Sequence, residues 1–376
     1  MDLSFSQEQL LLRDTAERVV RDRGGVERRR RLRDGARGFD PALWSEFAEL
    51  GWLALPFAEA DGGLGGGCQD LAILMEQMGR GLVQSPYLDT VVSCGALLAK
   101  GSQAQRARHI PPLLAGETQW SIACAEGGAH FSLADVTLRA VREADGWRLD
   151  GEKFAAPNAH AADWLIVSAR SSGERRDAQG LSLFIVPADA AGLHRQPVVL
   201  VDGSRGAHLQ LRDVCVDEEA LLGPAGHALP LLDAAIARAS VAMGAEALGA
   251  MEALLEQTVE YSKTRVQFGK PIGSFQALQH RMVEMYRHCQ SMRSLLYHAA
   301  IAADEQRPDA QQAAAALKVK LCEAGRFVSR EAVQIHGGIG MTDELAVSHY
   351  FRRLMLLNTL FGDGEHHLGR YLALGS

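Results

Sequence analysis

Two segments of the sequence carry the most specific combination of residue types in the chain. The first reads Arg265-Val-Gln-Phe-Gly-Lys-Pro-Ile-Gly-Ser-Phe-Gln276 and directly follows a long helical pattern, and the second, Gln334-Ile-His-Gly-Gly-Ile-Gly340, ends another helical pattern. Arginine forms paired, charge-assisted hydrogen bonds with phosphate groups, and glycine lets backbone N–H groups approach a phosphate. Each segment alone is a moderate signal, because glycines also end helices and an Arg-x-x-Phe pattern can serve packing.

Three other patterns could carry chemistry, but each has a plainer interpretation. The loop Asp61-Gly-Gly-Leu-Gly-Gly-Gly67 could cradle a phosphate, yet it matches neither a Walker loop nor a G-x-G-x-x-G turn, so a connector is favoured. His366 and His367 could suggest a metal, but neighbours on a helix point apart, which favours a solvent-facing pair. The basic run of Arg28 to Arg31 with Arg33 is typical of a solvated helix end or loop.

Composition limits the class of protein. The chain has 376 residues, of which 47% are apolar and 23% charged, and its net charge of −7 argues against nucleic acid or an anionic membrane as the main partner. Six widely spaced cysteines, without a C-x-x-C pair or a histidine at metal spacing, favour free thiols in a reducing compartment and no metal site. No secretory signal or bilayer-length apolar stretch is recognisable, so we expect a cytoplasmic protein.

The sequence pattern changes twice along the chain, which divides it into three regions. Residues 1–115 read as a helical domain, in which Ser6 and Gln9 form a capping box. Residues 226–376 read as a helical bundle of the four-helix type, with long alanine-rich patterns such as Leu229 to Tyr261.

Residues 116–225 between them read as strands joined by tight turns. Val136 to Val141 alternates, Asp145-Gly146 predicts a turn, and Asp150-Gly151 predicts a second one. Strands without intervening helices indicate an antiparallel β-barrel or sandwich rather than a Rossmann sheet. The predicted fold is therefore multi-domain α and β, in the order helices, β module, helices.

Taken together, the two segments, about 70 residues apart, strongly resemble the flavin-dependent acyl-CoA dehydrogenase family. The resemblance extends over nearly the whole chain. Leu55-Pro56 followed by Gly62-Gly-Leu-Gly65 is similar to the family's amino-terminal loop, and Leu221-Leu-Gly223 is similar to the turn that closes its β domain.

The resemblance implies a cofactor, a substrate class and partners. In the family, FAD lies across a subunit interface of a tetramer, and an acyl-CoA is the substrate. Electron-transfer flavoprotein is the implied electron acceptor, and no nucleic acid or membrane partner is implied. The FAD pyrophosphate and adenine are held by positions that correspond here to Arg265, Gln267, Phe268, Phe275, Gln276, Gln334, Gly337 and Gly338.

This sequence departs from the family where the chemistry takes place. The family's reaction needs a carboxylate base at the substrate's α carbon. The residue at the usual base position is Phe361, in the stretch Leu360-Phe-Gly-Asp363. At the family's alternative base position, on the helix before Arg265, stands Ala239, and Ser240 replaces a substrate-binding arginine. Asp363 and Glu246 remain as candidates for a relocated base, although a turn cap and a helix-side hydrogen bond are the plainer interpretations.

The β module departs as well. The family's Cys-x-Thr-Glu-Pro segment, which hydrogen-bonds the flavin ring, reads Cys124-Ala-Glu-Gly127. Its Lys-x-Trp-Ile-Thr-Asn strand reads Lys153-Phe-Ala-Ala-Pro-Asn158, so that Pro157 removes a hydroxyl and a backbone donor. The sequence therefore has the residues expected to bind the diphosphate and adenine of FAD, but it lacks several residues that contact the flavin ring in the family.

Three interpretations follow. The stretch Thr359 to His367 resembles the small subunits of two-component acyl-CoA dehydrogenases such as the pimeloyl-CoA type, in which a base-bearing sister chain completes the site. A homo-oligomer is not excluded by the sequence. The alternatives are an autonomous dehydrogenase with a relocated base, and a flavin-free scaffold or acyl-CoA-binding protein. The acyl chain of the substrate cannot be inferred, because the depth of an apolar pocket depends on packing.

Overall fold

The computed structural model describes residues 4–35 and 37–375. The chain divides into two compact units, each assembled from separate stretches of sequence. The first, called the helical unit here, comprises Met1–Asp34, Gly67–Val83 and Ser240–Ser376. The second, called the sheet unit, comprises Gly35–Gly66 and Gln84–Ala239. Residues 1–115 therefore contribute to both units, and the domain boundaries near residues 115 and 225 stay predictions.

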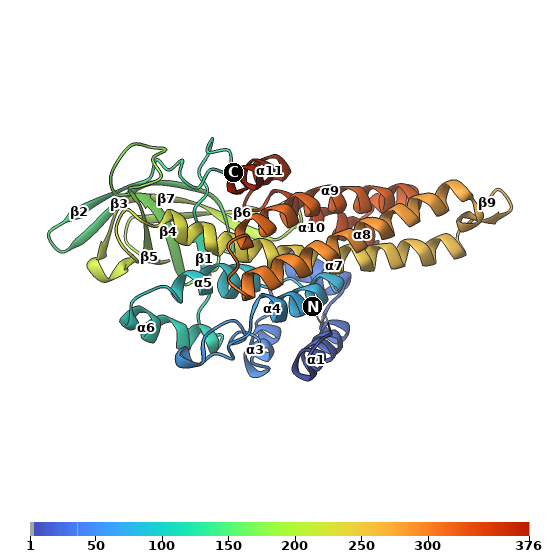
Figure 1. The fold of residues 1–376 in the computed structure, drawn as a ribbon, viewed down its shortest axis with the longest axis horizontal. Helices are drawn as coiled ribbons and strands as arrows, with labels where there is room; N and C mark the ends of the chain where they lie inside the picture. The colour runs from blue at the N-terminus through green and yellow to red at the C-terminus, as the bar shows by residue number, and fades with distance from the viewer. Residues whose placement is uncertain (1–3, 36, 376) are drawn as a thin grey trace. The chain divides into compact units, whose positions relative to one another are not determined.

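The helical unit is built around long helices that run alongside one another. α9 packs against α8, α10 and α11, and α4 packs against both α1 and α8 (Figure 1). The helices of this unit are α1 (Gln7–Arg23), α2 (Val26–Asp34), α4 (Cys68–Arg80), most of α7 (Leu229–Thr264), α8 (Gln276–Asp304), α9 (Ala310–His336), α10 (Ala346–Thr359) and α11 (Gly364–Leu374). The predicted capping box is confirmed, since Ser6 caps α1 together with Gln9.

Two glycines bring α4 and α7 into close contact. A Cβ atom on Gly79 would lie 2.0 Å from the Glu246 carbonyl oxygen, and one on Gly249 would lie 1.9 Å from the Glu76 carbonyl oxygen. Both separations are far shorter than a van der Waals contact, so each helix needs glycine at the crossing. This contact fixes the middle of α7, the helix that ends just before Arg265.

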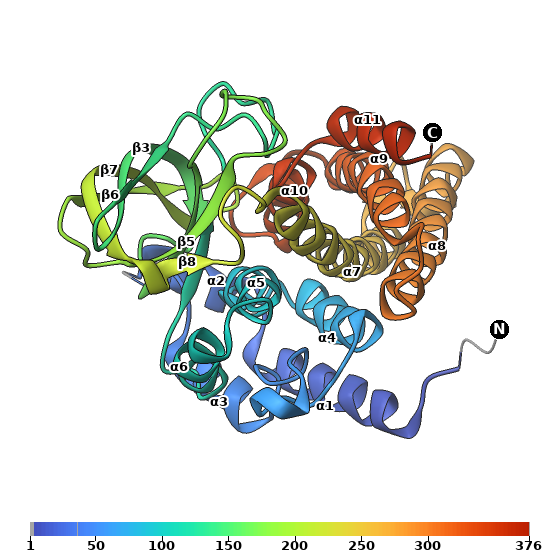
Figure 2. The same cartoon turned by 60° about the vertical axis from the view of Figure 1, so that its left-hand side comes forward.

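The sheet unit contains one sheet with short helices beside it (Figure 2). The strands are β1 (Trp120–Ala123), β2 (Arg139–Glu143), β3 (Gly146–Pro157), β4 (Trp164–Arg170), β5 (Leu181–Pro187), β6 (Leu193–Val199), β7 (Arg205–Asp217) and β8 (Leu221–Leu222). They follow the order β6-β7-β3-β2-β4-β5-β8, with β1 paired to β4. The helices of this unit are α3 (Pro41–Glu49), α5 (Gly95–Leu98), α6 (Gln103–Leu114) and the π-helix at Leu88–Cys94.

The sheet differs from the sequence prediction in two details. Most pairings are antiparallel, but β1 and β4 pair in parallel, and β2 meets β4 in parallel at one residue pair. The predicted turn at Asp150-Gly151 is wrong, because β3 continues through it. Gly151 instead follows a register shift against β7 and has a φ of 141°, a conformation that glycine adopts easily. The Asp145-Gly146 turn is confirmed, since Gly146 pairs with Glu143.

The described residues include no helix that is long and apolar enough to cross a membrane.

Candidate cofactor and active-site segments

The first predicted cofactor segment forms a small hairpin after α7. Its strands are β9 (Val266–Gln267) and β10 (Lys270–Pro271). The backbone of Arg265 is fixed from both sides, since its N–H donates to Tyr261 O at 2.9 Å and its carbonyl accepts from Ile272 N at 2.8 Å. Its side chain is exposed and has no hydrogen bond or ion pair to any part of the chain that the structure describes. The guanidinium is therefore free to bind an external anion.

The aromatic residues of the hairpin form an exposed surface. Phe268 is 91% exposed and has a φ of 56°, a conformation uncommon for a non-glycine residue. Its ring stands edge-on to Phe275 at 6.1 Å between centroids, and Lys270 Nζ lies 4.5 Å from the centre of the Phe275 ring. Gln276 begins α8 next to this pair, and Gln267 is exposed in the hairpin itself. An aromatic ring that is exposed to solvent, as Phe268 is, suits contact with a bound ligand or a second protein chain.

The second segment is an open glycine turn at the end of α9. Gly337 has a φ of 68°, and a Cβ atom on Gly337 or Gly338 would meet nothing within 4 Å. Packing inside the chain therefore does not require these glycines, and both are exposed. The Gly337 N–H donates to Val333 O and caps α9. Gln334 is exposed beside them on α9. The end of α7 reaches this turn, because Tyr261 stacks on His336.

Phe361 lies in the loop after α10, and three buried side chains bind carbonyl groups in the last turn of α10 and in this loop. Lys318 Nζ donates to Leu357 O. Cys322 Sγ donates to Asn358 O at 3.2 Å, and His367 Nε2 donates to Phe361 O at 3.0 Å. Burial lowers the pKa of Lys318 to about 8 and that of His367 to about 3. Phe361 itself has a φ of 57°, so that these hydrogen bonds maintain a conformation that is costly for this residue.

Both candidates for a relocated base are engaged in structural contacts. The Asp363 carboxylate accepts from His366 N at 2.9 Å and caps α11. Glu246 is 4% exposed and forms a paired ion bridge with Arg353, at 2.6 and 2.9 Å.

The expectation of a solvent-facing histidine pair is wrong for His367, which is 3% exposed. Among the described residues no cluster of histidine, cysteine and carboxylate side chains could hold a metal ion.

In the sheet unit, a buried ion pair anchors the segment Cys124-Ala-Glu-Gly127. Glu126 accepts from Lys153 Nζ at 2.7 Å, from Thr137 N at 2.7 Å and from Leu138 N at 3.1 Å. Lys153 is buried and also donates to Ser168 Oγ at 3.0 Å. Burial alone would raise the pKa of Glu126, but Lys153 and the hydrogen bonds keep the pKa below its usual value. The loop is therefore rigidly held, although Ala125 has no hydroxyl to offer.

An aromatic pair next to this loop was not found from the sequence. Phe154 is 55% exposed and its ring lies 4.3 Å from that of His208 on β7. His208 Nδ1 accepts from the N–H of Ala155, whose φ is 46°. The sequence resemblance places Ala155 at the family's tryptophan position, and the ring of the preceding residue, Phe154, is exposed beside it. The pairing depends on the strand register, which the sequence alone does not give.

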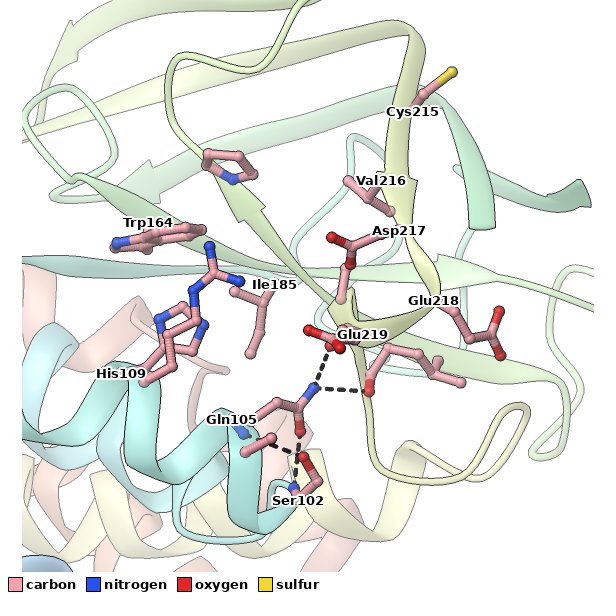
Figure 3. Close-up of a pocket in the computed structure, with 15 residues that line it drawn as sticks. Ser102, Gln105, His109, Trp164, Ile185, Cys215, Val216, Asp217, Glu218 and Glu219 are labelled. Carbon is pink, nitrogen blue, oxygen red and sulfur yellow. Dashed lines mark hydrogen bonds between the residues drawn. The ribbon is translucent and has the colours of Figure 1, made fainter. Parts of the chain in front are cut away.

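A pocket of about 550 Å³ lies elsewhere in the sheet unit, between α6 and the strands β5 and β7 (Figure 3). Arg108 stacks over Trp164 at 5.7 Å on one side, with His109 beside it, and Asp217, Glu218 and Glu219 line the other. Burial lowers the pKa of His109 to about 4, so that its imidazole is neutral at pH 7. The residues that line this pocket include none of those that the sequence predicted for FAD or catalysis.

Comparison with known proteins identifies the family. Models of the acyl-CoA dehydrogenase N-terminal, middle and C-terminal domains match residues 6–117, 121–214 and 229–372. Acyl-CoA dehydrogenase IpdE2 of Mycolicibacterium smegmatis is 32% identical over 369 residues, which cover 97% of this chain and 98% of that protein. The chain belongs to the acyl-CoA dehydrogenase family.

Two solved structures show the same fold over nearly the whole length. A variant of the Tcur3481-Tcur3483 steroid ACAD has a TM-score of 0.88 and 30% identity, over 98% of this chain and 97% of that one. The ChsE4-ChsE5 complex from Mycobacterium tuberculosis has a TM-score of 0.89 and 26% identity, over 99% of both chains. The expected helical, β and helical order of an acyl-CoA dehydrogenase is confirmed.

Family membership makes this protein an oxidoreductase that acts on acyl-CoA, with FAD as cofactor. The residues of the helical unit fit such a cofactor. Arg265 offers a cation without a partner among the described residues, Gly337 and Gly338 leave the space where a Cβ would stand, and Phe268 presents an exposed ring. These features suit the diphosphate and adenine of FAD.

Proposed function

We propose that this chain is the subunit of a two-component acyl-CoA dehydrogenase that contributes the diphosphate and adenine side of a shared FAD site. A base-bearing sister chain supplies the carboxylate. The observation that carries this proposal is the loop at Phe361. Buried Lys318 and Cys322 hold the end of α10, and buried His367 holds the Phe361 carbonyl. The residue presented there nevertheless has a phenyl ring and cannot accept a proton.

The state of the remaining carboxylates supports the same function. A general base must be within hydrogen-bond reach of the proton it removes. The Asp363 carboxylate is occupied as a helix cap and Glu246 is paired with Arg353. An autonomous enzyme would have to break one of these contacts, and breaking a buried ion pair costs about 3–5 kcal/mol.

The roles of the cofactor residues follow from their chemistry. FAD supplies the hydride acceptor when it is bound. The Arg265 guanidinium binds the diphosphate through its fork of N–H groups, and the exposed backbone at Gly337 and Gly338 lets the same anion approach where a side chain would stand in the way. Phe268 and Phe275 cover the adenine, while Gln267, Gln276 and Gln334 provide hydrogen bonds to it or to the ribose. Electron-transfer flavoprotein is the proposed electron acceptor.

The solved relatives whose names join two gene products are consistent with a two-chain enzyme. The ChsE4-ChsE5 structure is named as a complex, and the Tcur3481-Tcur3483 structure is named as a steroid ACAD. We propose an analogous pairing here, with an acyl-CoA as the substrate. A tetramer of mixed composition is the proposed assembly.

Flavin content tests this function directly. The chain is purified alone and also after co-expression with an acyl-CoA dehydrogenase that is encoded beside it and retains the glutamate. We expect little FAD in the first preparation and one FAD per pair of chains in the second, measured by flavin absorbance against protein concentration. One FAD per chain in a homo-oligomer of this protein would contradict the proposal, and no flavin in either preparation would favour the scaffold alternative.

A further inference from the structure

The two cofactor segments meet at one aromatic contact in the helical unit. The rings of Tyr261 and His336 are stacked with 4.3 Å between centroids and 24° between planes. The Tyr261 hydroxyl also donates to the His336 carbonyl oxygen at 3.4 Å. Tyr261 lies on the last turn of α7, and His336 is the last residue of α9. Residues 75 positions apart are thereby held together where both helices end.

Each of the two aromatic residues stands just before one of the cofactor segments. The Tyr261 main-chain carbonyl accepts from Arg265 N at 2.9 Å, so that the last turn of α7 leads directly into the hairpin. His336 is 6% exposed, its Nδ1 donates to Ala332 O at 2.8 Å, and the open turn begins with the next residue, Gly337. A shift of either ring therefore moves its segment.

The far end of the glycine turn is held independently. Asp343 accepts from Arg33 on α2 at 3.0 Å and from Arg352 on α10 at 2.5 Å, and the His349 imidazole donates to its backbone oxygen at 2.9 Å. Between these fixed points Gly337 and Gly338 are exposed. The turn is thus supported at both ends, and the exposed backbone at Gly337 and Gly338 lies between these supports without side chains to cover it.

We propose that Tyr261 and His336 are positioning residues for FAD, whose stacked rings set the separation between the Arg265 guanidinium and the Gly337–Gly338 backbone. This inference rests on the proposed role of those groups in binding the diphosphate. Charged and backbone donors bind an anion tightly only when both reach it without rearrangement. The stack provides this preorganisation, because it joins the ends of the two helices from which the segments start.

The test measures FAD affinity in the flavin-binding assembly after the cofactor has been stripped, by titration of flavin fluorescence. Tyr261→Leu removes the ring, and Tyr261→Phe is its matched control, which keeps the ring and loses the hydroxyl. An aromatic pair contributes about 0.5–1.5 kcal/mol, so we expect Tyr261→Leu to weaken FAD binding by about 3- to 10-fold and Tyr261→Phe by less than about 2-fold. Should Tyr261→Leu not fold, His336→Leu removes the stack from the other side and carries the same expectation.

A double variant separates positioning from a general loss of structure. If the stack acts through Arg265, Tyr261→Leu should add little to the loss already caused by Arg265→Ala. Losses that add in full would overturn the inference. Hydrogen exchange of residues 337–341 gives a readout without cofactor, and it should rise in Tyr261→Leu and stay unchanged in Tyr261→Phe.

The outcomes also distinguish this inference from the proposed function. Unchanged FAD affinity in Arg265→Ala would refute the proposed cofactor role itself. Reduced affinity in Arg265→Ala with normal affinity in Tyr261→Leu would refute only the positioning role.

Discussion

The Phe361 loop of the helical unit and the Cys124-Ala-Glu-Gly127 segment of the sheet unit are preserved in the same way. Each backbone is held by buried polar side chains, Lys318 and His367 in the first and the Glu126–Lys153 pair in the second. In each, the resemblance to the family predicts that a side chain needed for the family's chemistry is missing. The cofactor hairpin at Arg265 is the opposite case, with few internal side-chain contacts and all of its binding residues.

This difference separates the residues that shape a site from those that react in it. Loss of a buried anchor destabilises the fold, whichever residue the anchored backbone presents. Exposed residues such as Arg265 contribute little to the stability of the fold, so stability does not explain why an arginine stands at this position. Binding of a cofactor does, and it explains why the exposed hairpin is complete while the supported loops are not.

The largest expected effect concerns the anchor of the sheet unit. Glu126→Ala leaves the Lys153 charge buried without its partner, which should lower the free energy of unfolding by about 3–5 kcal/mol. Urea unfolding followed by circular dichroism measures this change. The control is Glu143→Ala, which removes the exposed pair with Arg148 and should cost less than about 1 kcal/mol. Equal effects of the two substitutions would show that the segment is not anchored in this way.

A substitution in the exposed hairpin should weaken cofactor binding and leave the stability of the fold unchanged. Arg265→Ala should weaken FAD binding by about 1.5–3 kcal/mol, since one charge-assisted phosphate contact is lost. The midpoint of thermal unfolding of the flavin-free protein should stay unchanged, because the side chain has no partner among the described residues. The control is Lys263→Ala, which removes a nearby exposed cation that pairs with Glu260. This variant should bind FAD normally.

The anchor at His367 predicts a pH dependence of stability. Burial holds the pKa of this histidine near 3 in the folded state, well below the usual 6.5. Between these values the unfolded chain binds a proton that the folded chain does not, so that stability falls as the pH decreases from 6.5 towards 3. The titration of His367 should lower the free energy of unfolding by about 1–2 kcal/mol when the pH decreases from 7 to 5. His367→Gln cannot titrate, and urea unfolding at the two pH values should show a smaller difference in this variant than in the natural protein.

The smallest expected effect concerns the missing base. Phe361→Glu restores a carboxylate on a supported loop, and a positioned general base is worth about 10²–10⁴-fold in rate. We still expect no dehydrogenation of acyl-CoA by this chain alone, because Ala125 and Pro157 leave the flavin ring without its usual partners. A clear increase in flavin reduction under single-turnover conditions would contradict the sister-chain proposal and show that only one residue is missing.

Local patterns predicted local structure well. The capping box at Ser6, the long helix before Arg265 and the turn at Asp145-Gly146 depend on neighbouring residues, and all three are confirmed. Asp150-Gly151 was misread because a glycine with positive φ serves equally in a turn or in a bulge, and pairing with β7 decides between them. The basic run on α2 was expected in water, whereas Arg29 is 3% exposed and Arg33 bonds to Asp343, 310 residues away.

The sequence alone determined the order of helices and strands, and it predicted the two cofactor segments and a phenylalanine at the base position, because each depends on residue type and short spacing. Only the tertiary structure decided which carboxylates remain available. Glu246 meets Arg353 across 107 positions, and Lys318 on α9 donates to the Leu357 carbonyl on α10 across 39 positions. Such contacts depend on how helices pack, and residues distant in sequence carry no local sign of their future partners.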